Sequence, residues 1–399
     1  MSRSQAGNNI RSSDAPTSVT PRGETLRYVE YLRALAVVCV VWCHFVSAQL
    51  IHENRTWKPL ELVERYVTDP LAIIQQFGFF GVAVFFLVSG FIVSHVAVDE
   101  SAAQFAIRRV FRIFPMLIVT TLLVYPFLWI ENAMHGISRA PVPSIPDSLF
   151  GMSLLNYPFR PSVTVIAVAW TLAVEVAFYG LMFLVHPLQR RNGALATWAM
   201  LAVVAYVVDR STVDTGAIAA LGGIFVFVPL VLLGRAIWLR WSSRISVGHF
   251  ALLSIASWCV FVWAVDRRQP DSFDPGNSYG VSMGVAYGVF VVALLLEPTI
   301  RRRWYVTWVS ERSYSIYLLH LYTGVLVLDA LSGHAPYTLA LVLALLATIV
   351  ASEFTYRFVE RPMRRFARGL SNGGLRRTVA PRLVRARFGS SSYTLTERT

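Results

Sequence analysis

Long apolar runs recur along the whole chain, and they restrict its possible folds more than any other feature. Ten windows are apolar over a length suited to crossing a bilayer as a helix. The chain is 55% hydrophobic with a mean hydropathy of +0.53, well above what the core of a soluble protein requires. We therefore predict an all-α fold, a polytopic transmembrane helix bundle of about ten spans. The windows are 28–50, 77–98, 112–131, 164–186, 194–208, 217–239, 246–266, 280–298, 313–331 and 336–358.

Basic residues are distributed unevenly between the two sides of these windows. If the N-terminus lies in the cytoplasm, 27 basic residues fall on the inner side, 8 on the outer side and Arg33 inside the first window. Inner loops of membrane proteins are enriched in arginine and lysine, so this asymmetry predicts that both termini are cytoplasmic. Topology also accounts for the formal net charge of +13, and we expect no nucleic-acid partner.

The two ends of the chain differ in composition from the region between them. Residues 1–25 are polar and lack an apolar core, which predicts a disordered cytoplasmic tail and not a signal peptide. Residues 26–366 hold all the apolar windows and form the predicted transmembrane domain. From residue 367 to 399 the chain is rich in Gly, Ser and Arg, which predicts a disordered basic tail near lipid headgroups.

The first window carries two ionisable side chains, Arg33 and His44. They are eleven residues apart, so on a helix they return to within about 20° of one another, separated by roughly 16 Å. Ionisable groups inside a membrane are costly and usually serve a function. We predict that one helix face holds a cation near one membrane surface and a proton acceptor deeper in the bilayer.

Three arginines, Arg108, Arg109 and Arg112, lie between the second and third windows. Arg109 and Arg112 are three residues apart, so on a helix they share a face and can bind one phosphate-bearing ligand together. The alternative is that they only set the membrane topology.

Two other windows hold isolated polar residues. Ser89 follows an aromatic run and precedes a glycine; it suits close helix packing or ligand contact, and it lacks the sequence-adjacent base of a nucleophile. Glu175 lies near the middle of window 164–186. It either orients a catalytic histidine, as the third member of a triad does, or pairs with a buried arginine such as Arg33.

Tyr314, Tyr317 and His320 recur at three-residue spacing in the ninth window. They share one broad helix face, and a polar stripe of this kind faces a cavity or the bundle interior. His320 is either a second functional histidine or an interior one with satisfied hydrogen bonds.

Six segments in this order match a known family pattern. Together they resemble the integral-membrane acyltransferase 3 family, whose members O-acylate sugars on bacterial surface polysaccharides, lipopolysaccharides, Nod factors or secreted macrolides. The resemblance covers about residues 26–366. The segments are the pair Arg33 and His44, Phe85–Phe91, Arg109–Arg112, Trp170–Tyr179, Ser313–His320 and Val359–Pro362.

The resemblance implies roles for four of these residues. His44 matches the essential histidine, Arg33 its partner toward the cytoplasm, and Arg109 and Arg112 the pair that engages acyl-CoA. Many members carry an additional extracytoplasmic hydrolase-like domain; this chain has no room for one, so we expect the stand-alone type in a bacterial inner membrane. We expect no bound metal or cofactor, with acyl-CoA, in the simplest case acetyl-CoA, as co-substrate. Further pocket candidates are Ser89, Trp170, Tyr179, Tyr314, Tyr317 and His320.

These observations lead to the hypothesis of a membrane O-acyltransferase that acts on a carbohydrate or glycolipid hydroxyl. His44 is the expected general base, with Glu175 or a tyrosine holding its tautomer; an acyl-histidine relay is an alternative route. Glycan-biosynthesis proteins are possible partners. A transporter or flippase for a polysaccharide or lipid-linked sugar, with the buried ionisable groups as a proton relay, is the alternative function.

Overall fold

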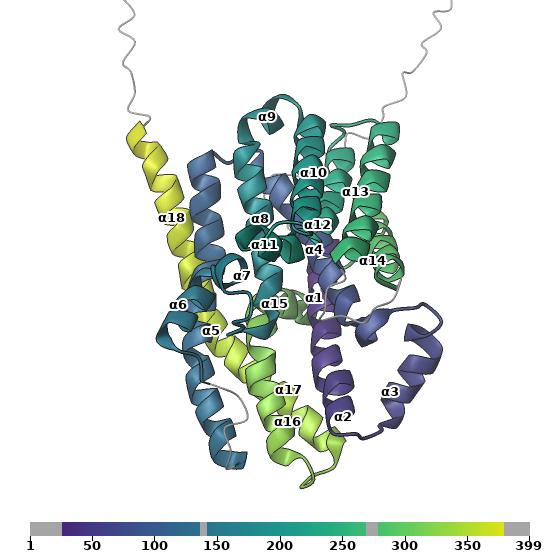
Figure 1. Cartoon of the computed structure of the whole chain (residues 1–399), viewed down its shortest axis with the longest axis vertical. Helices are drawn as coiled ribbons and strands as arrows, with labels where there is room; N and C mark the ends of the chain where they lie inside the picture. Colours follow the sequence, from purple (N-terminus) through teal and green to yellow (C-terminus); the bar gives the residue numbers. More distant parts are fainter. Residues whose placement is uncertain (1–25, 136–141, 269–277, 379–399) are drawn as a thin grey trace, which may run out of the picture.

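A computed structural model describes residues 26–135, 142–268 and 278–378 (Figure 1). All secondary structure in these ranges is helical, which confirms the predicted all-α fold. The predicted tail 1–25 and the last part of the predicted tail 367–399 lie outside the described residues.

Eight helical segments of the described chain are long and apolar enough to cross a membrane. A ninth is added if two helices that meet at an angle of 45°, α11 (Ala217–Phe225) and α12 (Val228–Trp241), count as one span. The eight segments are Arg27–His52, Ile74–Ala97, Ala102–Met134, Ala167–Leu184, Gly193–Arg210, Val247–Arg268, Trp304–Leu331 and Tyr337–Ser371.

Each of the ten apolar windows is helical, but two of them differ from a straight span. Window 217–239 is broken because Pro229, in the first turn of α12, lacks the N–H that would continue a helix from α11. Window 280–298 forms α14 (Ser278–Leu295), whose apolar part, Tyr279–Leu295, is shorter than the eight spans.

Figure 1 shows the arrangement of the helices, which are of two kinds, long and short. The long ones are α1 (Arg27–Trp42), α4 (Gly78–Ala97), α5 (Ala102–His135), α8 (Trp170–Leu184), α10 (Gly193–Arg210), α13 (Val247–Arg268), α15 (Trp304–His320), α17 (Tyr337–Thr355) and α18 (Arg361–Thr378). Shorter helices are α2 (Gln49–His52), α3 (Lys58–Val63), α6 (Ile145–Ser153), α7 (Asn156–Phe159), α9 (His186–Arg191) and α16 (Leu326–Leu331). Two short segments are 3₁₀-helical, η3 (Ile74–Phe77) and η4 (Ala167–Ala169). Four are π-helical: η1 (Cys43–Ala48), η2 (Glu64–Thr68), η5 (Leu321–Val325) and η6 (Tyr356–Glu360).

The central helix α4 is buried on nearly all sides and crosses α12 at very short range. A Cβ atom placed on Gly90 would lie 1.8 Å from the carbonyl oxygen of Val231, and one on Gly234 would lie 2.1 Å from that of Leu87. Only glycine permits this approach of two backbones. The crossing holds α4, and with it Ser89, against the neighbouring helices.

Helix α5 begins ten residues earlier than its apolar window, at Ala102. The reason is a capping box, in which the Ser101 N–H donates to Gln104 Oε1 (2.9 Å) and the Gln104 N–H donates to Ser101 Oγ (3.2 Å). The three arginines from 108 to 112 therefore lie on the same continuous helix that crosses the bundle.

Helices α1 and α15 run parallel to each other. Arg33 on α1 contacts Ser313, and His44, just beyond the end of α1, contacts His320 at the far end of α15. Seven apolar windows lie between them in the sequence, and an odd number of crossings is what a parallel pair requires. Leu26 and Arg368 line one cavity, so the two ends of the described chain lie at the same end of the bundle. Their cytoplasmic location stays a prediction.

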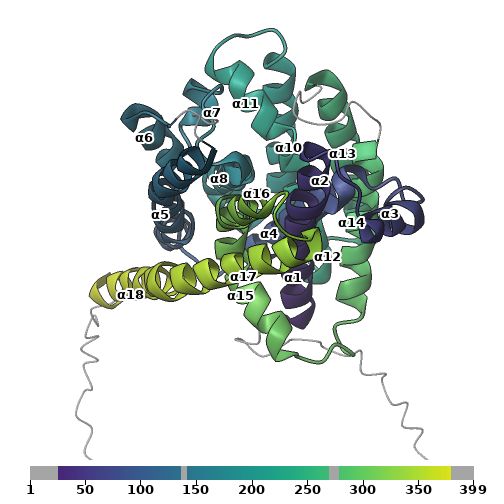
Figure 2. The same ribbon diagram turned by 90° about the horizontal axis from the view of Figure 1, so that it is seen from below.

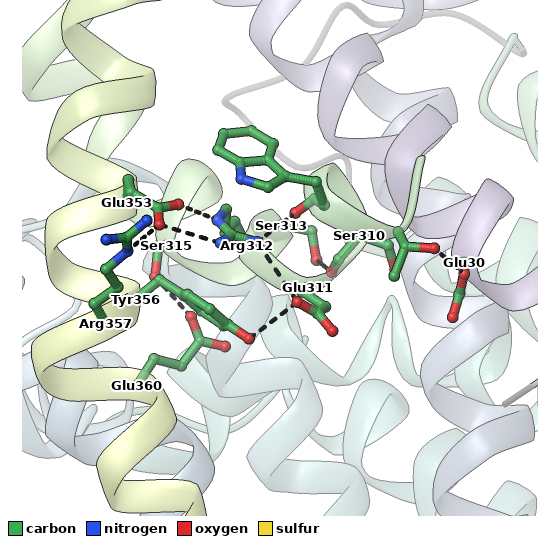
Figure 3. Close-up of polar contacts among 12 residues, drawn as sticks. Glu30, Ser310, Glu311, Arg312, Ser313, Ser315, Glu353, Tyr356, Arg357 and Glu360 are labelled. Atoms are coloured by element: carbon green, nitrogen blue, oxygen red, sulfur yellow. Dashed lines mark hydrogen bonds and ion pairs between the residues drawn. The ribbon is translucent and has the colours of Figure 1, made fainter. Parts of the chain in front are cut away.

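Helices α17 and α18 form one extended rod across the bundle, joined by the π-helical segment η6 (Figure 2). The rod continues to Thr378, so residues 367–378, which the sequence placed in an irregular tail, are helical. An ion pair and a hydrogen bond attach the rod to α15 near this joint: Arg312 pairs with Glu353, and the Tyr356 hydroxyl donates to Glu311 Oε2 at 3.2 Å (Figure 3).

Candidate active site

A cavity of about 1040 Å³ occupies one end of the bundle, where the described chain begins and ends. Its walls come from α1, α4, α5, α8, α15, η6 and α18. Most of the residues singled out from the sequence line it: Arg33, Ser89, Arg109, Arg112, Glu175, Tyr314 and Tyr317. The structure thus brings together side chains that are up to 284 positions apart in the chain.

The wall of this cavity is strongly cationic. Ten arginines line it, against three glutamates, Glu30, Glu175 and Glu311. A surface with this imbalance, partly enclosed by apolar walls, attracts a ligand that carries several negative charges. The arginines are Arg33, Arg108, Arg109, Arg112, Arg302, Arg312, Arg361, Arg364, Arg365 and Arg368.

Arg109 is the most enclosed of the α5 arginines. Its guanidinium carbon lies 5.2 Å from the ring centre of Phe105 and 5.6 Å from that of Tyr179, and its Nη2 lies 3.5 Å from Glu100 Oε2. Its Nε is buried and has no hydrogen-bond partner among the described residues. Arg109 therefore keeps a donor in reserve for a ligand while two rings hold its side chain in place.

Glu175 is the acidic centre of the inner wall. It accepts hydrogen bonds from Ser89 Oγ (3.0 Å) and from the Tyr179 hydroxyl, and Arg112 Nη2 lies 3.6 Å from its Oε1. The contacts match the arginine-partner alternative, although the arginine is Arg112. The expectation that Glu175 orients His44 is wrong, because His320 occupies that position.

The partner of His44 is His320. Nε2 of His320 lies 3.0 Å from Nδ1 of His44, while Nδ1 of His320 lies 2.7 Å from the carbonyl oxygen of Tyr317. A carbonyl oxygen only accepts, so Nδ1 of a neutral His320 carries the proton and its Nε2 is an acceptor. His44 Nδ1 must then donate, to His320 and to the carbonyl oxygen of Val40 at 3.0 Å. Nε2 of His44 keeps its lone pair.

Both histidines lie where an α-helix passes into a π-helical turn. His44 belongs to η1, and His320 is the last residue of α15 before η5. The two turns pack against each other through Phe45, because a Cβ on Gly324 would lie 1.9 Å from the Phe45 ring. Single π-helical turns inside membrane or soluble helices frequently occur at functional sites.

Neither histidine lines the cavity itself. The cavity follows α15 from Ser310 through Tyr314 to Tyr317, one turn short of His320. The Tyr317 hydroxyl lies 2.9 Å from Thr171 Oγ1, and its ring centre lies 5.6 Å from that of Phe85. Tyr317, Thr171 and Phe85 thus form one layer of the cavity wall, and Tyr317 connects this layer to the histidine pair, its ring centre lying 6.0 Å from that of His320.

The remaining candidates have distinct positions. Arg33 lines the cavity and donates from Nη2 to Ser313 Oγ at 2.9 Å, and the Tyr314 hydroxyl donates to the Ile113 carbonyl at 2.8 Å. Tyr179 does not line the cavity itself, but it contacts the lining residues Glu175 and Arg109. Trp170 packs against Phe227 with ring centres 4.8 Å apart and does not line the cavity, which indicates a packing role.

Sequence reasoning missed the arginines of α18 and the residues that form the layer with Tyr317. The α18 arginines at 361, 364, 365 and 368 have the spacing of one helix face. That signal was present, but the four arginines follow the last apolar window, 336–358, and Arg368 falls in the predicted tail. Thr171 and Phe85 carry no signal of their own, since each is an ordinary residue of an apolar helix.

Comparison with known proteins matches this bundle to one family. Residues 26–357 match the family described as an acyltransferase domain. The chain belongs to this acyltransferase family. The matched region ends four residues before α18 begins, so it includes both histidines and most of the cavity wall.

The curated relatives of this acyltransferase share 24–30% of their residues with it over the aligned regions. It is 24% identical to O-acetyltransferase OatA of Staphylococcus aureus over 330 residues, which is 72% of this chain and 53% of the relative. It is 30% identical over 226 residues to acyltransferase MdmB of Streptomyces mycarofaciens, covering 55% of this chain and 54% of the relative. It is 24% identical over 333 residues to a putative peptidoglycan O-acetyltransferase, YrhL of Bacillus subtilis, covering 72% and 50%. The acyltransferase thus spans about half the length of these relatives. No solved structure matches it.

Proposed function

We propose that this chain is a membrane O-acyltransferase that moves an acyl group, in the simplest case acetyl, from acyl-CoA to a hydroxyl of a carbohydrate or glycolipid. The observation that carries the proposal is the position of the His44–His320 pair one helical turn beyond a cavity lined by ten arginines. Membership of the acyltransferase family and the O-acetyltransferase names of the relatives from Staphylococcus and Bacillus support it.

The cationic cavity suits the donor. The phosphates of acyl-CoA are the anionic end of a long molecule, and arginine binds phosphate in a bidentate manner. Arg33, Arg109 and Arg112 take the phosphates nearest the pantetheine arm, and the arm extends along α1 toward His44. The separation of roughly 16 Å between Arg33 and His44 along the helix is a distance that an extended pantetheine covers.

The histidine pair suits the chemistry of acyl transfer. Nε2 of His44 removes the proton from the acceptor hydroxyl as its oxygen attacks the thioester carbonyl carbon, forming the C–O bond. The C–S bond then breaks, and the leaving thiolate takes the proton back from His44. During the step, Nδ1 of His44 stays hydrogen-bonded to His320 Nε2 and the Val40 carbonyl, which stabilise the imidazolium. General base catalysis of this kind contributes about 10² to 10⁴ in rate.

The layer at Tyr317 controls how donor and base meet. The thioester reaches His44 when the Tyr317 side chain swings away from Thr171, and the layer otherwise separates the phosphate-binding cavity from the base. This arrangement keeps water in the cavity away from the reacting thioester. In this proposal the cavity opens to the cytoplasm of a bacterial cell, where acyl-CoA is made, and the acceptor approaches from the opposite side.

The proposal is tested with the full chain in lipid nanodiscs, radiolabelled acetyl-CoA and a membrane glycan or glycolipid fraction as acceptor. We expect label in the acceptor with the wild-type chain and a loss of at least 10² in rate for His44→Ala. His334→Ala, which removes an exposed histidine whose ring hydrogen-bonds the backbone carbonyl of Ser332, is the matched control. Near-normal transfer by His44→Ala, or movement of glycan across the bilayer without acetyl-CoA, would count against the proposal.

A further inference from the structure

Four arginines of α18 form a continuous stripe on the wall of the cavity. Arg361, Arg364, Arg365 and Arg368 are spaced as successive turns of one helix face, and all four line the cavity. They lie beyond residue 357, where the match to the acyltransferase family ends, although Arg361 falls within the segment Val359–Pro362 that resembles the family pattern. Nothing in the family match therefore assigns them a role.

The start of α18 is held firmly against α15. Ser315 Oγ donates to Glu360 Oε2 at 2.6 Å, and Arg364 Nη2 lies 3.0 Å from Glu360 Oε1 (Figure 3 shows the Ser315–Glu360 contact). The Tyr356 ring lies 4.4 Å from the Arg312 guanidinium carbon and 5.6 Å from that of Arg364. These contacts position the first turn of the stripe relative to the inner cavity wall.

The middle of α18 is held against α5. The rings of Phe366 and Phe111 meet edge to face with centres 5.3 Å apart, and Arg108 Nε donates to Ser371 Oγ at 3.1 Å. Anchored on both sides of its arginines, α18 presents the stripe as part of a preformed wall. Preformed donors lose little conformational entropy when an anion binds.

Three of the four stripe arginines differ from the inner arginines in their charge balance. Arg109, Arg112, Arg312 and Arg364 each have a carboxylate partner. Within the part of the chain that the structure describes, Arg361, Arg365 and Arg368 form no ion pair, and all three are exposed. A solvated basic face of a cytoplasmic helix would have the same charge. What distinguishes these three is that they face the cavity that holds Arg109 and Arg112.

We propose that Arg361, Arg365 and Arg368 form a second phosphate site at the rim of the cavity, which binds the 3′-phosphate on the ribose of the CoA donor. The inference rests on the proposed function, because it extends the donor site outward. Along the donor the order is thioester, pantetheine, pyrophosphate and ribose 3′-phosphate. Along the cavity the order is the histidine pair, the Tyr317 layer, the inner arginines and the α18 rim. The two orders match, so the outermost phosphate meets the outermost arginines.

The experiment compares acetyl-CoA with acetyl-3′-dephospho-CoA as donors for the full chain in nanodiscs. For Arg365→Ala/Arg368→Ala we expect KM for acetyl-CoA to rise about tenfold, with little change in KM for the dephospho donor. The matched control is Arg301→Ala/Arg303→Ala, which removes the same formal charge from exposed arginines that do not line the cavity. We expect this control to retain the wild-type preference. An equal rise for both donors, or an equal effect in the control, would overturn the assignment.

Anionic lipid headgroups offer the same phosphate chemistry, and the assay separates them from the nucleotide. Each variant is measured in nanodiscs of phosphatidylcholine alone and of phosphatidylcholine with phosphatidylglycerol. The proposal requires the loss of donor preference in both; a defect that appears only with phosphatidylglycerol, and equally for both donors, assigns the stripe to lipid and overturns it.

Two further measurements keep the test decisive if the alanine variant folds poorly or the proposed reaction is wrong. Arg365→Lys/Arg368→Lys keeps the charges and should retain most of the preference for acetyl-CoA. Calorimetric binding of CoA and 3′-dephospho-CoA needs no acceptor, and the wild-type chain should bind CoA about tenfold more tightly. A chain that shows this preference but transfers no acetyl group refutes the proposed function only. A chain that transfers acetyl without the preference refutes the rim site only.

Discussion

Nε2 of His320 lies 3.0 Å from Nδ1 of His44, so two histidines 276 positions apart form one hydrogen-bonded pair. The pair is directional: the backbone of α15 determines which nitrogen of His320 accepts, and His320 together with the Val40 carbonyl determines which nitrogen of His44 is free. The geometry gives His320 the position that a carboxylate holds in a catalytic triad.

The first prediction concerns His320 as a positioning residue. His320→Ala removes one of the two acceptors of His44 Nδ1 and leaves only the Val40 carbonyl, so the ring is held less firmly in its productive orientation. We expect kcat to fall about 10²-fold with KM for acetyl-CoA little changed. His320→Gln places an amide oxygen near the lost Nε2 and should recover part of kcat. Steady-state kinetics of both variants test this. A purely structural role predicts instead that Gln and Ala behave alike and that protein yield falls with activity.

The second prediction concerns Glu175. Glu175→Gln removes the charge that faces Arg112 Nη2 at 3.6 Å while keeping an acceptor for Ser89. We expect KM for acetyl-CoA to change severalfold, because Arg112 loses the partner that orients it, and kcat to change less. Initial rates over a range of donor concentration measure the two parameters. If Glu175→Gln instead reproduces the kcat loss of His320→Ala with an unchanged KM, Glu175 acts on the base and our reading of it fails.

The third prediction concerns the crossing of α4 and α12. Gly90→Ala and Gly234→Ala each force a methyl group into a backbone carbonyl, at 1.8 and 2.1 Å in the present packing. Overpacking of this kind costs about 1–3 kcal/mol. We expect a lower thermal unfolding temperature in detergent. Gly288→Ala, on α14, has nothing within 4 Å of the added methyl and serves as the control; equal stability of all three variants would show that the helices separate easily.

The fourth prediction concerns Arg235, which is 1% exposed and is surrounded by uncharged acceptors. Its guanidinium donates to Thr197 Oγ1 at 2.9 Å and reaches Ser94, Gln189 and the Gly193 carbonyl at 3.3–3.4 Å. Arg235→Ala strands these acceptors, at about 1–3 kcal/mol for each one left unsatisfied. We expect poor folding in the membrane, measured by size-exclusion chromatography of a fluorescent fusion. Arg240→Ala, on the same helix but exposed, should behave like wild type.

The positions of the helices were predictable because a bilayer imposes a length and a composition on every span. Helix periodicity also predicted which residues share a helix face. Arg33 and His44 both contact α15, and Arg109 and Arg112 both line the cavity. The break before α12 carried its own signal in Pro229. So did the early start of α5, in the pair Ser101 and Gln104.

Contacts between distant helices were not predictable from one sequence. The pairing of Glu175 with Arg112 depends on how α8 packs against α5, and that of His44 with His320 depends on α1 against α15. Periodicity places each residue on a face but does not say which face meets which. The Tyr317 layer was missed for the same reason, since Thr171 and Phe85 acquire a role only through their neighbours.

The parallel pairing of α1 and α15 fixes the distance between Arg33 and His44. Arg33 contacts the middle of α15 at Ser313 and His44 contacts its last residue, His320, so the two helices together hold the spacing between cation and imidazole. In the proposed reaction, a donor is then selected by the length of the arm between its phosphates and its thioester, and not only by its acyl group. Truncated thioesters that lack the nucleotide have no phosphate for the arginines to bind, so nothing positions them at the base. In the same proposal, acyl groups of different size extend past the histidine pair toward the acceptor, where the spacing of Arg33 and His44 does not restrict them.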